Sequence, residues 1–196
     1  MGKLFTLPEA YTIVKKAGMT MPFLLRAQRK GQMTEAFKER LMLAVTEVNG
    51  CRMCSWAHTR IALEAGLSPE EIGEMLAGQM EKVPADELPA ALFAQHYADA
   101  RGNFSREAWT GVVARYGWDG AMGILGAVRG IMLGNAYGIP LGSLLSRLRG
   151  RRAAIDPRSS AGYELLILLT APAVIPIALL HAFFARLLRV PVAPRV

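Results

Sequence analysis

Residues 34–69 read TEAFKERLMLAVTEVNGCRMCSWAHTRIALEAGLSP, and this stretch predicts two helices joined by a tight turn. Thr34 is a residue type that caps helices, and apolar residues follow it at helical spacing over positions 37–48. Gly50 predicts the end of that helix, because glycine tolerates the left-handed backbone conformation that closes helices. A second helix is therefore expected to begin at once, over residues 51–65.

Outside this pair, the same kinds of signal predict further helices. Ser68, which a proline follows, is expected to cap the next helix. Later helices are expected over residues 89–101, 105–116 and 121–136. The last of them is expected to end near Gly138, and the first 32 residues to form short helices that Gly18 and Pro22 interrupt. No segment offers convincing two-residue alternation, so the sequence predicts an all-α fold.

The C-terminal quarter of the chain differs from the rest in charge and hydrophobicity. Residues 1–146 hold 15 lysines and arginines against 14 acidic residues, whereas residues 147–196 hold eight arginines against two acidic residues. Residues 165–184 carry no charge, and twenty helical residues at about 1.5 Å each match the roughly 30 Å hydrocarbon layer of a bilayer. We therefore expect a helical domain over 1–146, a basic linker over 147–162 and a hydrophobic tail over 163–196.

Two placements of this tail remain open. Pro172 and Pro176 can each bend its helix, yet membrane helices tolerate proline. The tail is expected either to insert into a membrane through residues 165–184 or to pack on the body or in an oligomer interface. No aromatic residue lies among the arginines of residues 147–158, so this charge favours anionic lipid over nucleic acid. Because the first residues lack the apolar run of a signal peptide, the body is expected to be cytoplasmic, anchored to the cytoplasmic face of the cell membrane if the tail inserts.

Cys51 and Cys54 are the only cysteines of the chain, and their spacing limits their chemistry. A structural zinc site needs four ligands, and no second cysteine pair completes one. Covalent haem attachment needs a histidine directly after the second cysteine, where this chain has Ser55. A dithiol that cycles between reduced and disulfide forms needs only the pair, so we expect a redox centre without metal or cofactor.

The residues around the pair favour a reactive thiol. The pair lies at the predicted start of a helix, where exposed backbone N–H groups stabilise a thiolate. His58 follows Cys54 by four residues, hence on the same helix face, and could take the thiol proton or stand as a cation beside the thiolate. If the two helices fold back antiparallel, Glu39 lies near His58 and could orient it. The alternative for Glu39 is an ordinary solvated glutamate.

The pattern Glu39-x11-Cys51-x2-Cys54-x3-His58 resembles the carboxymuconolactone decarboxylase and AhpD-like alkylhydroperoxidase superfamily over residues 30–140. The resemblance implies an all-α, AhpD-like subunit that forms trimers or hexamers. It also implies that Cys54 attacks a peroxide and that Cys51 resolves the product into a disulfide. By the same resemblance His58 is the base, Glu39 is its proton-relay partner, and an external dithiol is the reductant.

Met53 stands where well-studied members of that superfamily have a second histidine between the cysteines, which weakens the implied proton relay without touching the dithiol. The predicted function is a thiol-dependent peroxidase or disulfide oxidoreductase. One alternative is a decarboxylase or lyase of the same fold, although those enzymes lack the cysteine pair. The other is a non-catalytic, redox-responsive or structural subunit at the membrane. His96 is expected to be an ordinary helix residue, and Trp56 to pack against protein rather than bind substrate.

Overall fold

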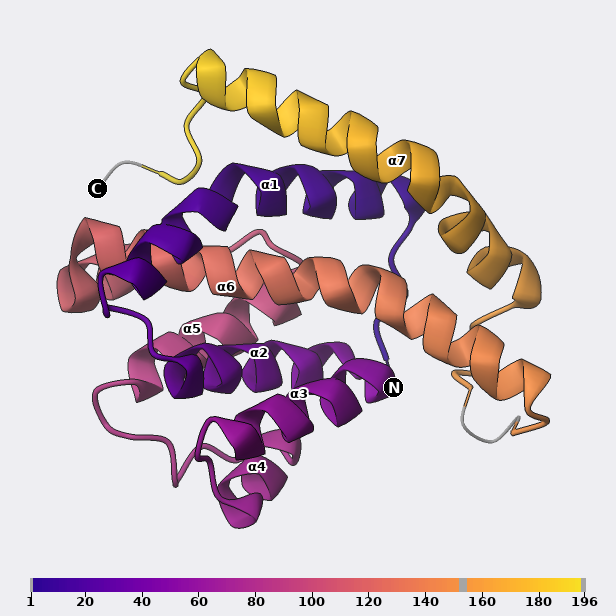
Figure 1. Cartoon of the computed structure of the whole chain (residues 1–196), viewed down its shortest axis with the longest axis horizontal. Helices are drawn as coiled ribbons and strands as arrows, with labels where there is room; N and C mark the ends of the chain where they lie inside the picture. Colours follow the sequence, from indigo (N-terminus) through magenta and orange to yellow (C-terminus); the bar gives the residue numbers. More distant parts are fainter. Residues whose placement is uncertain (1, 152–154, 195–196) are drawn as a thin grey trace.

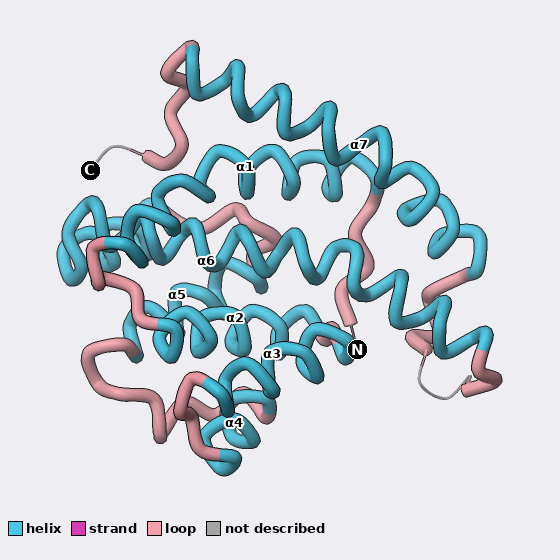
Figure 2. The backbone as a smooth tube through the Cα atoms, in the orientation of Figure 1, coloured by secondary structure: helices cyan, strands magenta, loops and turns pink. Residues whose placement is uncertain are grey.

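Seven helices and no strand make up the described part of the chain, residues 2–151 and 155–194 of a computed structural model. In chain order they are α1 (Leu7–Arg29), α2 (Glu35–Asn49), α3 (Arg52–Glu64), α4 (Pro69–Leu76), α5 (Leu88–Asp99), α6 (Arg106–Leu148) and α7 (Ala161–Leu187). Figure 2 shows these helices and the loops that join them. The predicted all-α fold with a C-terminal apolar helix is confirmed.

The long helix α6 lies at the centre, and the other helices pack on its two sides (Figure 1). On one side α1 lies along α6, and α7 covers the outer surface of α1. On the other side α2 and α5 pack against α6, and α3 and α4 lie beyond α2. The beginning of α3 also reaches α6, and this contact positions the candidate site.

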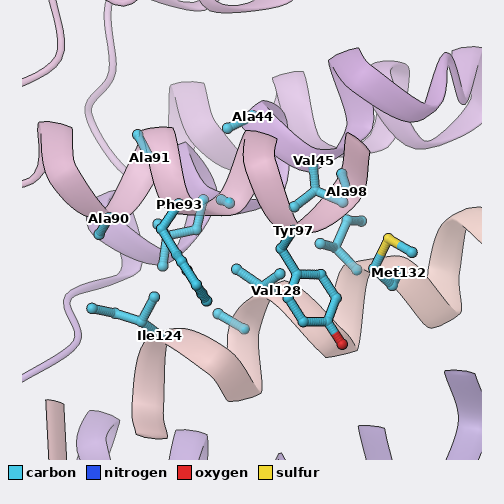
Figure 3. Close-up of a cluster of buried hydrophobic side chains, with 14 of the residues drawn as sticks. Ala44, Val45, Ala90, Ala91, Phe93, Tyr97, Ala98, Ile124, Val128 and Met132 are labelled. Carbon is cyan, nitrogen blue, oxygen red and sulfur yellow. The ribbon is translucent and has the colours of Figure 1, made fainter. Parts of the chain in front are cut away.

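The core between α2, α5 and α6 is built from closely packed apolar side chains (Figure 3). Phe93 and Tyr97 of α5 lie against Val128 and Met132 of α6, with Val45 of α2 beside them. None of these five residues is more than 4% exposed. Burying one such side chain stabilises a fold by about 1.5–3 kcal/mol, so this packing fixes α2, and with it the turn into α3, relative to α6.

The helix ends predicted around that turn are confirmed. The Thr34 side chain accepts the backbone N–H of Phe37 at the start of α2. Gly50 ends α2 with a φ angle of 67°. The Ser68 side chain caps α4 by accepting the backbone N–H of Glu71. These caps depend on neighbours in the sequence, which is why the sequence predicts them.

The helix interruptions expected at Gly18 and Pro22 and the helix end expected near Gly138 are wrong. α1 is a single helix that continues through Gly18 and Pro22, and α6 continues past Gly138 to Leu148. Both helices pack against neighbours along their length, and such packing outweighs the weak preference of one residue to break a helix. The break that does occur is at Gly117, whose φ of 67° and ψ of 171° separate the two helices expected on either side of it.

The C-terminal apolar helix α7 continues through Pro172 and Pro176 and curves over α1 (Figure 1). By length and composition alone, both α6 and α7 could cross a membrane. The apolar window of α6 is 72% buried, as in the core helix of a soluble protein, against 17% for α7. The division into domain, linker and tail stays a prediction, and its residues 1, 152–154 and 195–196 lie outside the described residues.

Candidate active site

A disulfide joins Cys51 and Cys54 at the start of α3. Cys51 caps this helix, and its Sγ accepts the backbone N–H of Cys54 at 3.3 Å. N–H groups at a helix N-terminus stabilise negative charge, so the same position would stabilise a thiolate after reduction. Cys51 is fully buried and Cys54 is 8% exposed, which makes Cys54 the more accessible of the two sulfur-bearing residues.

One turn further along α3, His58 meets Glu39 of α2. Nδ1 of His58 lies 2.6 Å from Oε2 of Glu39. An ionised carboxylate only accepts hydrogen bonds. With Glu39 ionised, Nδ1 therefore carries the hydrogen, and Nε2 is the nitrogen left to exchange a proton. The antiparallel arrangement of α2 and α3 thus brings together the two residues that the sequence predicts to be neighbours.

Glu39 itself is a fully buried carboxylate. Its Oε2 contacts His58, while its Oε1 has no hydrogen-bond partner among the described residues. Nζ of Lys38 forms an ion pair with Oε1 at 3.4 Å. A buried charge is costly unless it is paired, so the histidine and the lysine compensate the burial of this carboxylate. In this buried position, the Glu39 carboxylate holds the imidazole of His58 in one orientation.

Gly138 of α6 lies directly over the disulfide. A methyl group at this position would lie 2.7 Å from Sγ of Cys54 and 3.0 Å from Sγ of Cys51. Both distances are shorter than ordinary van der Waals contact, so only glycine allows α6 to approach the two sulfurs this closely. Sequence reasoning missed this residue. Glycine destabilises the interior of a helix relative to alanine, so a glycine inside a predicted helix is the sequence signal that could have pointed to this close contact.

The turn between α2 and α3 is held to α6 by buried amides. Nδ2 of Asn49 donates to Oδ1 of Asn135 at 2.9 Å, and Nδ2 of Asn135 donates to Oγ1 of Thr46 at 3.3 Å. The carbonyl of Asn49 also accepts the backbone N–H of Lys3 at 2.8 Å. Asn135 is fully buried, and sequence reasoning missed its role because nothing local marks it. These bonds fix Asn49 and Gly50, the two residues that precede Cys51.

A groove of about 990 Å³ opens beside the disulfide. Gly50, Met53 and Gly138 are among the residues that line it. Gly138, which lies against both sulfurs, forms part of the wall of this groove. Trp56 also lines the groove with 73% of its surface exposed, so the expectation that Trp56 packs against protein is wrong.

Other candidate residues lie outside this constellation. Nε2 of His96 accepts the backbone N–H of Ser105 at 3.3 Å, which fits the expected ordinary helix residue. Within residues 2–151 and 155–194, no cluster of three or more histidine, cysteine, aspartate or glutamate side chains could hold a metal ion. The groups brought together here are therefore a cystine, an imidazole and a carboxylate.

The four expected site residues all come from α2, α3 and the turn between them. Residues 14–101 match the model of the carboxymuconolactone decarboxylase family. The resemblance that the sequence predicts is thereby confirmed for these residues. The carboxymuconolactone decarboxylase family includes decarboxylases and peroxidase-like enzymes. The matched segment begins within α1 and ends after α5, so Asn135, Gly138 and the whole of α7 lie outside it. No curated protein and no solved structure matches the chain.

Proposed function

We propose that this protein acts as a thiol-dependent peroxidase. The observation that carries the proposal is a disulfide at the N-terminus of a helix, one turn from a histidine that a buried glutamate holds. A disulfide needs only an external dithiol to return to the reactive form. The family match is consistent with this activity, because peroxidase-like enzymes are among its members.

The reaction would begin with Cys54, the more exposed of the two sulfur-bearing residues. Its thiolate attacks one oxygen of a hydroperoxide, the O–O bond breaks, and Cys54 becomes a sulfenic acid while an alkoxide leaves and takes up a proton to become an alcohol. The Cys51 thiol then displaces the hydroxyl group of the sulfenic acid, which forms the disulfide and releases water. An external dithiol reduces this disulfide by exchange and is itself oxidised to a disulfide.

His58 would transfer the proton of the Cys54 thiol, with Glu39 as its hydrogen-bond partner. Nε2 of His58 takes the proton of the Cys54 thiol and delivers it to the leaving alkoxide. Glu39 holds Nδ1 through the 2.6 Å contact and stabilises the imidazolium that forms between these two transfers. Because the carboxylate is buried, this stabilisation acts where water screens it little.

The test is oxidation of dithiothreitol by hydrogen peroxide and by an organic hydroperoxide, with the two cysteines replaced in turn. Cys54→Ser is expected to abolish turnover. Cys51→Ser is expected to react once and to stop as a sulfenic acid on Cys54, which dimedone labels and mass spectrometry detects. Thr59→Ala, on the same helix, is the matched control and should keep normal turnover.

Turnover by Cys54→Ser at the wild-type rate would overturn the proposal. Decarboxylation or lyase activity that survives replacement of both cysteines would instead favour the other chemistry represented in the family.

A further inference from the structure

The outer face of α7 consists of exposed hydrocarbon. Large apolar side chains cover it, among them Leu169 at 74% exposure and Phe183 at 61%. The only two polar side chains within residues 165–184 are already bonded, since Thr170 donates to its own helix backbone and His181 contacts a tyrosine hydroxyl of α1 at 2.8 Å. A helix that is apolar on all sides is normally covered on all sides. An exposed apolar face of this extent marks an interaction site.

The inner face of α7 is made of small residues that pack closely on α1. Ala178, Ala182 and Ala185 are buried there. A methyl group at Gly18 of α1 would lie 3.1 Å from Cβ of Ala182, so the two helices pack closely at this point. In the second half of α7, small buried side chains toward the body and large exposed ones away from it give the helix two distinct faces. Figure 1 shows α7 lying lengthwise over α1.

The beginning of α7 is fastened to the body by a buried carboxylate. Glu164 is fully buried and accepts two hydrogen bonds from Arg147 of α6, at 2.9 Å and 3.1 Å. The hydroxyl of Ser159 donates to the same carboxylate at 2.8 Å. Next to it, the hydroxyl of Tyr163 donates to the carbonyl of Phe5 at 3.1 Å. The helix therefore starts from a fixed point on the body.

The segment after α7 returns to the same body. Nη2 of Arg129 donates to the carbonyl of Val192 at 3.1 Å, and Nε1 of Trp109 donates to the carbonyl of Pro194 at 2.9 Å. Both donors belong to α6. A helix whose two ends are bound to one body cannot place those ends on opposite sides of a bilayer. This architecture argues against the spanning placement and for a helix that lies flat.

Positive charge flanks the apolar face at both ends. Arg149 and Arg151 lie before α7, Arg186 and Arg189 lie at its end, and all four are exposed. The acidic residues of the region, Asp156 and Glu164, are already paired with arginines. In a twofold dimer formed through this face, arginines of one copy would meet arginines of the other. Anionic lipid headgroups complement this charge, whereas a second copy repels it.

We propose that the outer face of α7 binds the surface of a bilayer that contains anionic lipid, with the helix axis parallel to the membrane. The large apolar side chains enter the boundary between headgroups and acyl chains, and the arginines at both ends contact the headgroups. The α1 helix covers the inner face of α7 in place of the polar face that an isolated interfacial helix would need. This inference does not depend on the proposed peroxidase activity.

Flotation of the full chain with vesicles tests the proposal. Vesicles of phosphatidylcholine with a quarter phosphatidylglycerol should carry the protein to the top of a density gradient, and vesicles of pure phosphatidylcholine should bind it at least tenfold more weakly. Arg149→Gln and Arg186→Gln should each weaken binding to the anionic vesicles about fivefold. High salt should weaken it further, because it screens the attraction between arginines and headgroups.

The apolar contribution is tested by the double variant Leu169→Glu, Phe183→Glu. Both side chains are exposed, so the fold should be retained, which circular dichroism checks, while vesicle binding should fall at least tenfold. Leu92→Glu is the matched control, because Leu92 is an equally apolar residue of α5 with 49% of its surface exposed. The control should bind vesicles as the wild type does.

Three results would overturn the proposal. The first is equal binding of the wild type and the double variant. The second is a stable dimer without vesicle binding, which the double variant dissociates in sedimentation velocity; this would assign the face to a second copy. The third is a C-terminal tag that is protected from protease when the chain is synthesised with sealed vesicles, which would mean that α7 spans the bilayer.

Discussion

Gly138 and Cys54 are in direct contact: a methyl group on Gly138 would lie 2.7 Å from the Cys54 sulfur. The two residues come from α6 and α3, so the redox pair is covered by the central helix of the fold. Gly138 has no side chain, so the backbone of α6 lies directly against the two sulfurs. Any movement of the sulfurs on reduction therefore takes place against α6.

Gly138→Ala is expected to lower the free energy of unfolding of the oxidised protein by about 1–3 kcal/mol, because overpacking forces helices apart. Gly134→Ala is the matched control on the same helix. Its added methyl group would lie 3.6 Å from Cδ1 of Ile131, an ordinary contact, so helix propensity should make it neutral or stabilising. Urea denaturation of the oxidised proteins measures both. Equal effects of the two substitutions would contradict the close approach.

Glu39→Gln is expected to lower peroxidase kcat/KM by about 10- to 100-fold, less than the loss of a general base itself, which costs roughly 100- to 10,000-fold. The amide cannot stabilise the imidazolium of His58 as the carboxylate does. Glu64→Gln is the control, since Glu64 lies on the neighbouring helix α3 with its side chain 64% exposed. A pH profile of kcat/KM that is the same in Glu39→Gln and in the wild type would show that Glu39 does not act through His58.

Asn135→Ala is expected to destabilise the fold by about 1–3 kcal/mol, because the buried polar groups of Asn49 and Thr46 lose their partner. The turn before Cys51 should loosen as well, which hydrogen exchange of residues around Gly50 would detect. Asn103→Ala, at an exposed loop position, should leave both measurements unchanged. Unchanged exchange at the turn in Asn135→Ala would mean that other contacts hold it.

Docking of α7 is expected to weaken in acid. Burial acts to raise the pKa of Glu164, but hydrogen bonds from Arg147 and Ser159 outweigh it and hold the pKa below the usual 4.5. The lowered pKa stabilises the fold above pH 4.5, and this stabilisation is lost as the pH falls through the lowered value. As the pH falls below 4.5, the wild type should therefore lose more stability than Glu164→Gln. Parallel pH dependence of unfolding in the two proteins would refute the role of this carboxylate.

Local sequence signals predicted the part of the site that is built locally. Thr34 and Gly50 cap the two ends of α2 through neighbouring residues, and the tight turn at Gly50 folds α3 back antiparallel to α2. Once that is known, the positions of Glu39 and His58 follow from their distances to the turn. The family resemblance implies which cysteine attacks the peroxide and which one forms the disulfide with it. These two roles are part of the proposed function.

Residues distant in sequence could not be predicted in this way. Asn135 and Gly138 reach the site because α6 passes over the turn, and no local pattern encodes that crossing. The expected breaks at Gly18 and Pro22 were wrong because packing of α1 between α6 and α7 outweighs them. The placement of the tail likewise depends on contacts at both of its ends, and composition alone leaves it open.

The hydrogen bond from Trp109 to the carbonyl of Pro194 gives the protein an internal optical reporter. Trp109 is fully buried, whereas Trp56 and Trp118 are 73% and 43% exposed, so blue-shifted emission comes from the one indole that the C-terminal segment touches. Release of that segment would admit water to the ring and shift its emission to longer wavelength. Quenchers in solution would remove the emission of Trp56 and Trp118. The remaining emission of Trp109 therefore reports whether the segment around Pro194 is bound to α6, without any added label.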